Sequence, residues 1–418
     1  MNILLFLISI IGSPGATPST INWPDYRGPN ADGHSASTGL PLTWSDTQNV
    51  KWKTPIHGRG WSSPIVWGSQ IWMTTATPDG AEQFVVCVDR ETGKVLLDKR
   101  LFTNSNPEPV ADINCYASPS PVIEEGRVYV HFGRYGTACL DTKSYNVLWS
   151  RRDLVCTHSV GPGSSPILFG NTVILTLDGT DQQFSVALDK RTGTTVWKVD
   201  RATHWGEGSP GQPNPRHKSF NTPVIFNVNG QLQMISPGAQ AVFAYDPIDC
   251  REIWRVRFDG YSNAARTLYG NGLIYVITGY DHSDLLAIRP EGQGDLTEKG
   301  IAWKCTKGVP FKPSALLVDD LFYMVNDTGT LTCLDAKTGA EVWKERIGGD
   351  FSASPLYADG RIYFFNERGK SVVIKPGRTF QVLAENSLPA GFMASPAVTG
   401  KSLILRTKTH LYRVENGG

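Results

Sequence analysis

The sequence lacks an excess of charge of either sign, because its 418 residues carry 40 Lys and Arg against 39 Asp and Glu. Attraction to a polyanion or to an anionic membrane surface needs a field of one sign, so this balance argues against a nucleic-acid-binding protein. Beyond Ile11 the chain also lacks any apolar run near the roughly 20 residues that a membrane-spanning helix needs. We therefore expect no nucleic-acid partner and no transmembrane segment.

The first apolar run, Asn2 to Ile11, has the length of a signal-peptide core and is followed by small residues and prolines. No Lys or Arg precedes Arg27, so the basic start of a typical leader is missing and an unprocessed N-terminus is the alternative. No Cys precedes Cys87, which leaves no N-terminal cysteine for a lipid anchor. We expect residues 1–18 to be a signal peptide, residues 19–49 an N-terminal extension, and the protein to be periplasmic or extracellular.

One phrase recurs along the chain: Ala or Cys, any residue, Asp, and then Trp eight residues after the Asp. Full copies occupy residues 139–149, 187–197, 244–254 and 333–343, and a fifth copy, 87–97, has Leu in the Trp position. Three copies contain Asp-x-x-Thr-Gly, in which the carboxylate can accept local backbone N–H groups and Gly can take the positive φ of a reversal. Each phrase therefore predicts a β-hairpin.

A second element precedes each phrase: Ser or Thr, Pro, a short apolar strand, a Gly or Asn turn, and a strand rich in β-branched and aromatic residues. Because proline lacks a ladder N–H, it belongs at the start of a strand. Each unit thus reads as four strands, and eight units of about 40 to 50 residues are typical of a β-propeller. The predicted fold is all-β, an eight-bladed propeller of four-stranded antiparallel blades over residues 50–418. The prolines are Pro64, Pro121, Pro166, Pro223, Pro355 and Pro396, with degenerate copies near Thr267 and Ser314.

The two ends of the chain complement each other. The last unit stops one strand short, at Asn416-Gly417-Gly418, whereas Lys51-Trp52-Lys53 resembles a fourth strand with no blade ahead of it. We expect residues 50–55 to complete the last blade and close the ring, which removes the open edges that a β array otherwise presents.

The repeat resembles that of the pyrroloquinoline-quinone (PQQ)-type propellers, and residues 335–343 (DAKTGAEVW) and 189–197 (DKRTGTTVW) carry the match best. That family includes quinoprotein dehydrogenases and the bacterial outer-membrane assembly factor B, a non-enzymatic scaffold. The resemblance specifies fold more than function, since the repeated residues are those that join blades. It implies that the late Trp packs between neighbouring blades against the small Ala or Cys of a third strand. The residues given this structural role are Trp52, Trp149, Trp197, Trp254, Trp303 and Trp343.

The seven cysteines include no adjacent pair and no Cys-x-x-Cys spacing, so zinc or dithiol chemistry is not indicated. Cys87, Cys139 and Cys333 occupy the slot that holds Ala in other copies and are interpreted as small buried hydrophobes. Cys115 and Cys156 lie in consecutive inter-blade connections, where a disulfide in an exported protein is one alternative and free thiols the other.

Candidate ligand-binding residues lie in the inter-blade connections, the longest of which are 98–117, 151–163 and 201–220. These connections open on the same propeller face as the loops between second and third strands, so distant polar residues can converge near the axis. Arg guanidinium groups can bind a carboxylate or phosphate, and Trp or Tyr rings offer a flat apolar surface, so these residues suit an anionic or sugar-like ligand. The alternative is that these long loops are polar for solubility alone. The candidates are His57, Arg59, Trp61, Tyr116, His158, Arg216, His217 and Arg266. No histidine spacing indicates a metal site.

Aromatic residues recur three or four positions before the strand-initiating proline. They are Trp61, Phe220, Phe351 and Phe392. We interpret this repeated position as a plug of the channel mouth, with ligand binding as the alternative.

Three functions remain. The favoured one is a non-catalytic, monomeric binding or scaffold protein of the cell envelope, whose loop face takes an envelope protein or a small polar or anionic ligand and which needs no cofactor. A PQQ-dependent quinoprotein dehydrogenase is the second. By family resemblance it would use adjacent cysteines, a Trp floor and Ca²⁺ held by acidic and amide side chains, and the adjacent cysteines are missing. A secreted recognition domain for polysaccharide or another small ligand is the third.

Overall fold

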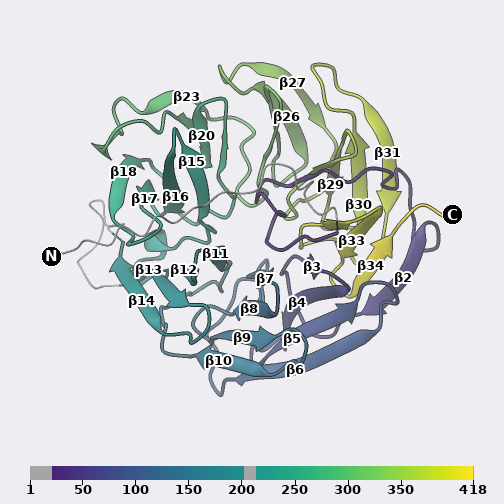
Figure 1. The fold of residues 1–418 in the computed structure, drawn as a ribbon. Coiled ribbons are helices and arrows are strands. Elements are labelled where there is room, and N and C mark those ends of the chain that lie inside the picture. Colours follow the sequence, from purple (N-terminus) through teal and green to yellow (C-terminus); the bar gives the residue numbers. More distant parts are fainter. Residues whose placement is uncertain (1–20, 202–212, 418) are drawn as a thin grey trace, which may run out of the picture.

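The computed structural model describes residues 21–201 and 213–417, and the predicted signal peptide lies outside them. The described residues form eight small antiparallel sheets arranged around a central axis (Figure 1). The only helix among them is one 3-10 turn, η1 (Pro215–His217). None of their helices is long and apolar enough to cross a membrane. The predicted eight-bladed propeller is confirmed.

Blades 1 to 4 follow one another in chain order, each running from an inner to an outer strand. Their strands are β3 (Ile65–Trp67), β4 (Gln70–Ala76), β5 (Glu82–Asp89) and β6 (Val95–Thr103); β7 (Val122–Glu124), β8 (Arg127–His131), β9 (Thr137–Asp141) and β10 (Val147–Arg151); β11 (Ile167–Phe169), β12 (Thr172–Asp178), β13 (Gln183–Asp189) and β14 (Thr195–Asp200); and β15 (Val224–Val228), β16 (Gln231–Gly238), β17 (Ala241–Tyr245) and β18 (Glu252–Arg257).

Blades 5 to 7 continue the ring, with two short parallel additions. Their strands are β19 (Leu268–Gly270), β20 (Leu273–Ile277), β21 (Leu285–Ile288) and β23 (Ile301–Cys305); β24 (Leu316–Val318), β25 (Leu321–Val325), β26 (Thr330–Asp335) and β27 (Glu341–Arg346); and β28 (Leu356–Ala358), β29 (Arg361–Phe365), β30 (Lys370–Ile374) and β31 (Val382–Ser387). The strand β22 (Gly294–Asp295) lies outside β18, and β1 (His34–Ser35) lies inside β28.

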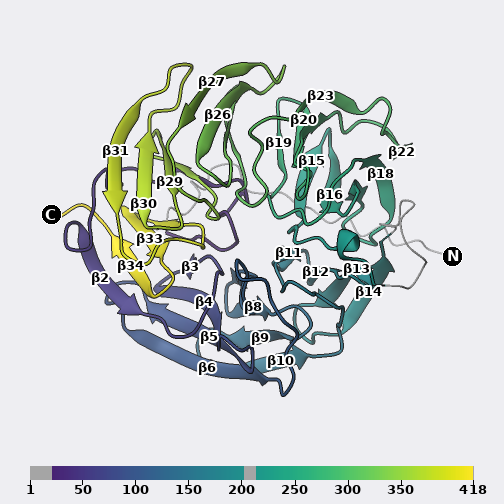
Figure 2. The same ribbon diagram turned by 180° about the vertical axis from the view of Figure 1, so that it is seen from behind.

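Blade 8 joins the two ends of the chain. It consists of β32 (Ala397–Thr399), β33 (Ser402–Arg406), β34 (His410–Val414) and, as its outer strand, β2 (Val50–Pro55). The pairing of β2 with β34 is antiparallel and runs from Val50 opposite Val414 to Pro55 opposite His410. Seen from behind, β2 lies beside β34 at the rim (Figure 2). The predicted closure of the ring by residues 50–55 is confirmed.

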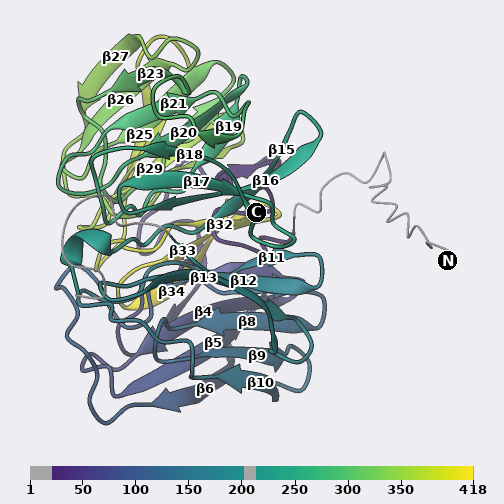
Figure 3. The same ribbon diagram turned by 90° about the vertical axis from the view of Figure 1, so that its left-hand side faces the viewer.

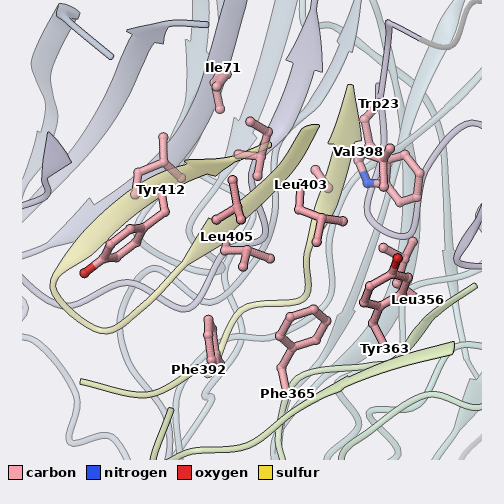
Figure 4. Close-up of a cluster of buried hydrophobic side chains, with 14 of the residues drawn as sticks. Trp23, Ile71, Leu356, Tyr363, Phe365, Phe392, Val398, Leu403, Leu405 and Tyr412 are labelled. Atoms are coloured by element: carbon pink, nitrogen blue, oxygen red, sulfur yellow. The ribbon is translucent and has the colours of Figure 1, made fainter. Parts of the chain in front are cut away.

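The hydrophobic core lies between the blades. In the described part of the chain, seven buried clusters lie between neighbouring sheets. Burying one large apolar side chain contributes roughly 1.5–3 kcal/mol. The largest cluster joins blades 7, 8 and 1 and includes Trp23 from the N-terminal extension, which lies beside Val398 of β32 (Figure 4). In blade 3 the two middle strands, β12 and β13, are almost fully buried, whereas the outer strand β14 has only exposed and half-buried residues.

The repeated Asp and Thr-Gly form the predicted turn. In blade 3, Asp189 Oδ1 accepts hydrogen bonds from the backbone N–H of Arg191 and Thr192, both at 2.9 Å. Gly193 follows at φ +72°, in the left-handed region. The Trp149 ring of blade 2 covers this glycine, and Trp149 Nε1 donates to Lys190 O at 2.9 Å. The turn of one blade is therefore the docking surface for the tryptophan of the preceding blade.

The other repeat tryptophans occupy equivalent places. Trp52, Trp303 and Trp343 donate from Nε1 to backbone carbonyls of the next blade, those of Arg90, Ala336 and Gly377. Trp197 and Trp254 pack in the clusters that follow their own blades. In blades 2 to 6, the Trp pairs across the ladder with the small residue of the third strand, as Trp149 does with Cys139.

The two faces of the disc differ. In the side view of Figure 3, the β11–β12 and β15–β16 hairpins project at one face and the 3-10 helix lies at the other. Each inner strand begins at the face of the helix, which we call the loop face. Residues 22–35 run along the opposite face, where the Asn22 side chain accepts from Gly68 N in the β3–β4 turn and Trp23 pairs with Val66.

Candidate functional site

The segments that lead into the inner strands line the axis. They are extended, so alternate side chains point the same way. The residue two positions before the Ser or Thr of each unit, or before Arg266 in blade 5, lines the axial cavity in all eight blades, and most of the Ser and Thr themselves line it one layer deeper. The outer layer consists of Trp61, Ser118, Gly163, Phe220, Ala264, Lys312, Ser352 and Met393.

The inner layer is a hydrogen-bonded ring that we call the hydroxyl crown: Ser63, Ser120, Ser165, Thr222, Ser314, Ser354 and Ser395. Except at Thr222, the backbone N–H of each crown residue donates to the crown hydroxyl of the next blade, and the backbone N–H of Arg266 in blade 5 donates in the same way to Ser314. The distances are 2.8 Å from Ser63 to Ser120 and 3.1 Å from Ser395 back to Ser63, with the other five links at 2.9 Å. Seven such links join eight blades, and Arg266 replaces the hydroxyl in blade 5. The crown fixes the inner strands relative to one another.

Arg266 is held by the N-terminal extension below the crown. Its guanidinium binds the Asp25 carboxylate with two N–O distances of 3.2 Å and also donates to Tyr26 O. Burial raises the pKa of Asp25 in spite of the opposing effect of Arg266. Arg266 was predicted on the loop face among the ligand-binding residues. Its buried side chain instead contacts Asp25 and Tyr26, which belong to the segment that runs along the opposite face.

Tyr26 closes the axis at this end. Its hydroxyl lies 3.4 Å from Ser314 Oγ and 3.2 Å from Ser354 Oγ. The next residue, Arg27, is buried and donates to Pro355 O at 2.5 Å and Ala315 O at 2.7 Å. What remains is a cavity of about 730 Å³, with Tyr26 at its floor and loop-face residues such as Ile113, Val160 and Tyr280 at its mouth.

Lys218 is the buried cation of the cavity wall. Its ammonium donates to His158 Nδ1 at 3.0 Å, Asp178 O at 2.9 Å and Ser219 O at 3.1 Å, and it lies 4.4 Å from the centre of the Phe220 ring. Burial lowers the pKa of Lys218 to about 8. Burial and the nearby ammonium hold the pKa of His158 well below its ordinary value, and burial lowers that of His131 to about 3. Both imidazoles are therefore neutral at physiological pH.

The predicted ligand-binding residues are only partly brought together. Trp61 lines the cavity with the Arg59 guanidinium 5.2 Å from its ring centre, and His158 reaches the cavity through Lys218. Arg216 lies near the mouth, 5.7 Å from the Tyr261 ring, while His217 is buried in η1. Tyr116 is buried against Tyr135 and donates to Glu108 O. His57 is at the rim, where it pairs with Asp98 at 3.0 Å.

The aromatic residues before the prolines separate into two groups. Trp61 and Phe220, three positions before, face the cavity, whereas Phe351 and Phe392, four positions before, are buried in inter-blade clusters. The interpretation of all four as a channel plug is therefore wrong for Phe351 and Phe392.

The cysteines are all free thiols, including Cys115 and Cys156, for which a disulfide was one alternative. Burial raises the pKa of Cys156 to about 12, so this thiol is not a nucleophile although it lies 3.8 Å from His158 Nε2. Within residues 21–201 and 213–417, no three His, Cys, Asp or Glu side chains gather as a metal site.

The ligand-binding candidates predicted from the sequence do not include the crown residues, Tyr26 or Lys218. The recurring Ser or Thr before Pro was the available signal for the crown, but it was used only to mark where strands begin.

Comparison with known proteins places the chain in a family. The family described as outer membrane protein assembly factor BamB matches residues 44–181, 182–292 and 293–384. No curated protein matches the sequence.

Solved structures share the fold at low identity. A europium-containing methanol dehydrogenase is 14% identical with a TM-score of 0.67, over 93% of this chain and 89% of that one. Quinohemoprotein alcohol dehydrogenase from Comamonas testosteroni is 11% identical with a TM-score of 0.68, over 95% and 81%. BamB from Moraxella catarrhalis is 10% identical with a TM-score of 0.59, over 87% and 99%. With three successive segments matched by one family and the same eight-bladed ring in its structure, this chain belongs to the BamB-type family of PQQ-like propellers.

Proposed function

We propose that this protein is a non-catalytic binding propeller of the cell envelope, exported by its N-terminal leader, which holds a small ligand in the axial cavity. One observation carries the proposal: the cavity is closed by Tyr26 and open at the loop face, and its wall is fixed by the hydroxyl crown. A preorganised concave site binds its ligand with little loss of conformational entropy in its own side chains. The family description, an outer-membrane assembly factor, supports the envelope as the place of action.

The PQQ-dependent dehydrogenase is the main alternative, and the donor set does not fit its cofactor. Ca²⁺ takes six to eight oxygen ligands, usually with several carboxylates. Among the described residues that line the cavity, Asp327 is the only carboxylate, and it accepts from Phe311 N at 2.6 Å and lies 3.7 Å from Lys312 Nζ. No adjacent cysteines occur anywhere in the sequence.

A recognition domain for sugars remains the third function, because Trp61 and Phe220 offer flat apolar surfaces to a sugar ring. Its ligand would be neutral and polyhydroxylated, which separates it experimentally from the charged ligand argued for below.

The test compares the wild type with a variant whose cavity is filled. Ala264 lies in the outer layer, so Ala264→Trp places a large ring in the cavity without touching the crown. Both proteins are incubated with a small-molecule extract of bacterial envelopes and analysed by native mass spectrometry. We expect the wild type to retain a compound that the variant does not. Equal retention by both proteins contradicts the proposal, as does a stoichiometric complex with PQQ and Ca²⁺ that oxidises alcohols.

A further inference from the structure

Five hydroxyls of the crown have an O–H donor that makes no hydrogen bond to an acceptor in the described part of the chain. Ser63, Ser120, Ser165, Thr222 and Ser395 line the cavity, and each accepts one backbone N–H. Among the described residues none of the five donates a hydrogen bond. A hydroxyl also carries one donor, and buried donors are nearly always paired. The floor of the cavity is therefore a ring of donors that suits a ligand group rich in acceptors.

Ser314 and Ser354 provide an internal comparison. They accept the same backbone N–H bonds within the crown, from Arg266 and Ser314 respectively. Their hydroxyls, however, face Tyr26 Oη, and neither lines the cavity. The crown thus has one structural role at all seven positions and a second, ligand-directed capacity at five.

Buried cations surround the same ring without carboxylate partners. Lys218 in the wall meets one imidazole and two carbonyls. Arg406 donates to Ser62 O at 2.9 Å, beside crown residue Ser63, and Arg27 donates to carbonyls beside Ser314 and Ser354. None of the three forms an ion pair with a carboxylate in the described part of the chain, and the nearby Asp25 is matched by Arg266. Charges in a low-dielectric interior act strongly, so the cavity attracts an anion.

We infer that the axial cavity binds its ligand through an oxyanion, which sits on the five free crown hydroxyls beside Lys218 while an apolar body lies against Trp61, Phe220 and Met393. Carboxylate, phosphate and sulfonate groups share this chemistry. The inference rests on the proposed function, since it names the class of ligand for the same cavity.

Two dyes of nearly the same shape test the charge requirement. 8-Anilinonaphthalene-1-sulfonate carries an oxyanion, and N-phenyl-1-naphthylamine has the same rings without it. Both become fluorescent in apolar sites, so each is titrated into the full-length protein. We expect the sulfonate to bind at least about tenfold more tightly than the neutral dye, because only the sulfonate accepts from the crown and pairs with Lys218. Benzoate and phenyl phosphate then compete with the sulfonate, which tells whether a carboxylate or a phosphate is preferred.

The variants separate binding from folding. Thr222→Val and Ser165→Ala each remove one cavity-facing hydroxyl together with its backbone bond, whereas Ser354→Ala removes the same kind of backbone bond on the Tyr26 side. Lys218→Met keeps the apolar stem and removes the charge. We expect Thr222→Val, Ser165→Ala and Lys218→Met to weaken sulfonate binding about fivefold or more, as lost hydrogen bonds to a charged group do, and Ser354→Ala to leave it unchanged.

The possible outcomes are distinct. Equal affinity for the two dyes, or equal effects of Ser165→Ala and Ser354→Ala, overturns the oxyanion inference and leaves the proposed binding function standing. If Ala264→Trp abolishes neither dye's binding and retains the same envelope compounds as the wild type, the cavity is not the site and the proposed function fails as well.

Discussion

The docking of tryptophan on the glycine turn can be measured with a matched pair of substitutions in blade 3. Gly193 and Gly170 both have positive φ, +72° and +51°. An added Cβ at Gly170 meets nothing within 4 Å, whereas at Gly193 it lies 2.7 Å from the Trp149 ring. Alanine costs about 1–2 kcal/mol at either position, because an L-residue is strained in the left-handed region.

Gly193→Ala has a further cost because the indole must move. Trp149 is buried and donates to Lys190 O at 2.9 Å, so displacement loses a hydrogen bond worth about 1 kcal/mol and part of the ring's packing. We expect Gly170→Ala to lower the free energy of unfolding by about 1–2 kcal/mol and Gly193→Ala by about 3–4 kcal/mol.

The assay is urea unfolding of the purified variants, followed by circular dichroism. A double-mutant cycle isolates the contact: in a Trp149→Ala background, Gly193→Ala should cost no more than Gly170→Ala, which gives a coupling of about 2 kcal/mol. Equal losses for the two glycines in the wild-type background, or an unchanged loss without Trp149, would refute this account of blade docking.

Three further measurements follow from the structure. Deleting residues 22–55 removes β2 and the segment that contains Trp23, so we expect an aggregating or unfolded chain. A soluble truncated protein with one cooperative melting transition would contradict closure of the ring. With a chromogenic disulfide reagent the native protein should show one reactive thiol, that of half-buried Cys305, and all seven after unfolding in guanidinium; five in the unfolded protein would reveal a disulfide. Sulfonate binding should be constant below about pH 7 and about tenfold weaker near pH 9. The reason is that the anion needs protonated Lys218, and burial lowers the pKa of Lys218 in the free protein to about 8. Lys218→Met should abolish this pH dependence. The other titratable or charged groups around the amine do not account for such a change, since His131 and His158 are neutral throughout, the pKa of Cys156 is about 12, Arg134 is paired with Glu108 and Asp178 with Arg201.

The sequence was sufficient for the fold because its repeats are local. The spacing from Asp189 to Trp197 lies within one hairpin, and the unmatched strand at residues 50–55 could be assigned to blade 8 by counting. The candidate site was harder to predict from the sequence than the fold. A shift of one residue decides whether an aromatic side chain before proline faces the axis, as Trp61 does, or the core between blades, as Phe351 does.

Contacts between distant segments explain the remaining misses. Arg266 was placed on the loop face from its position in a connection, but its partners Asp25 and Tyr26 come from the far end of the chain, and no local pattern links them. Lys218 reads as one polar residue in a polar loop. Only the tertiary structure surrounds it with His158 and the Asp178 carbonyl and makes it part of a wall.

The seam between β2 and β34 also fixes the order of events in time. Because Val50–Pro55 pairs with His410–Val414, the first blade-forming strand must wait, unpaired, until all the intervening blades have been synthesised and β34 has emerged. Pairings between segments so far apart in the sequence form slowly, and a nascent chain with an unpaired strand edge is prone to aggregation or incorrect strand pairing. A newly made molecule therefore stays vulnerable to wrong pairing until β34 emerges and pairs with β2.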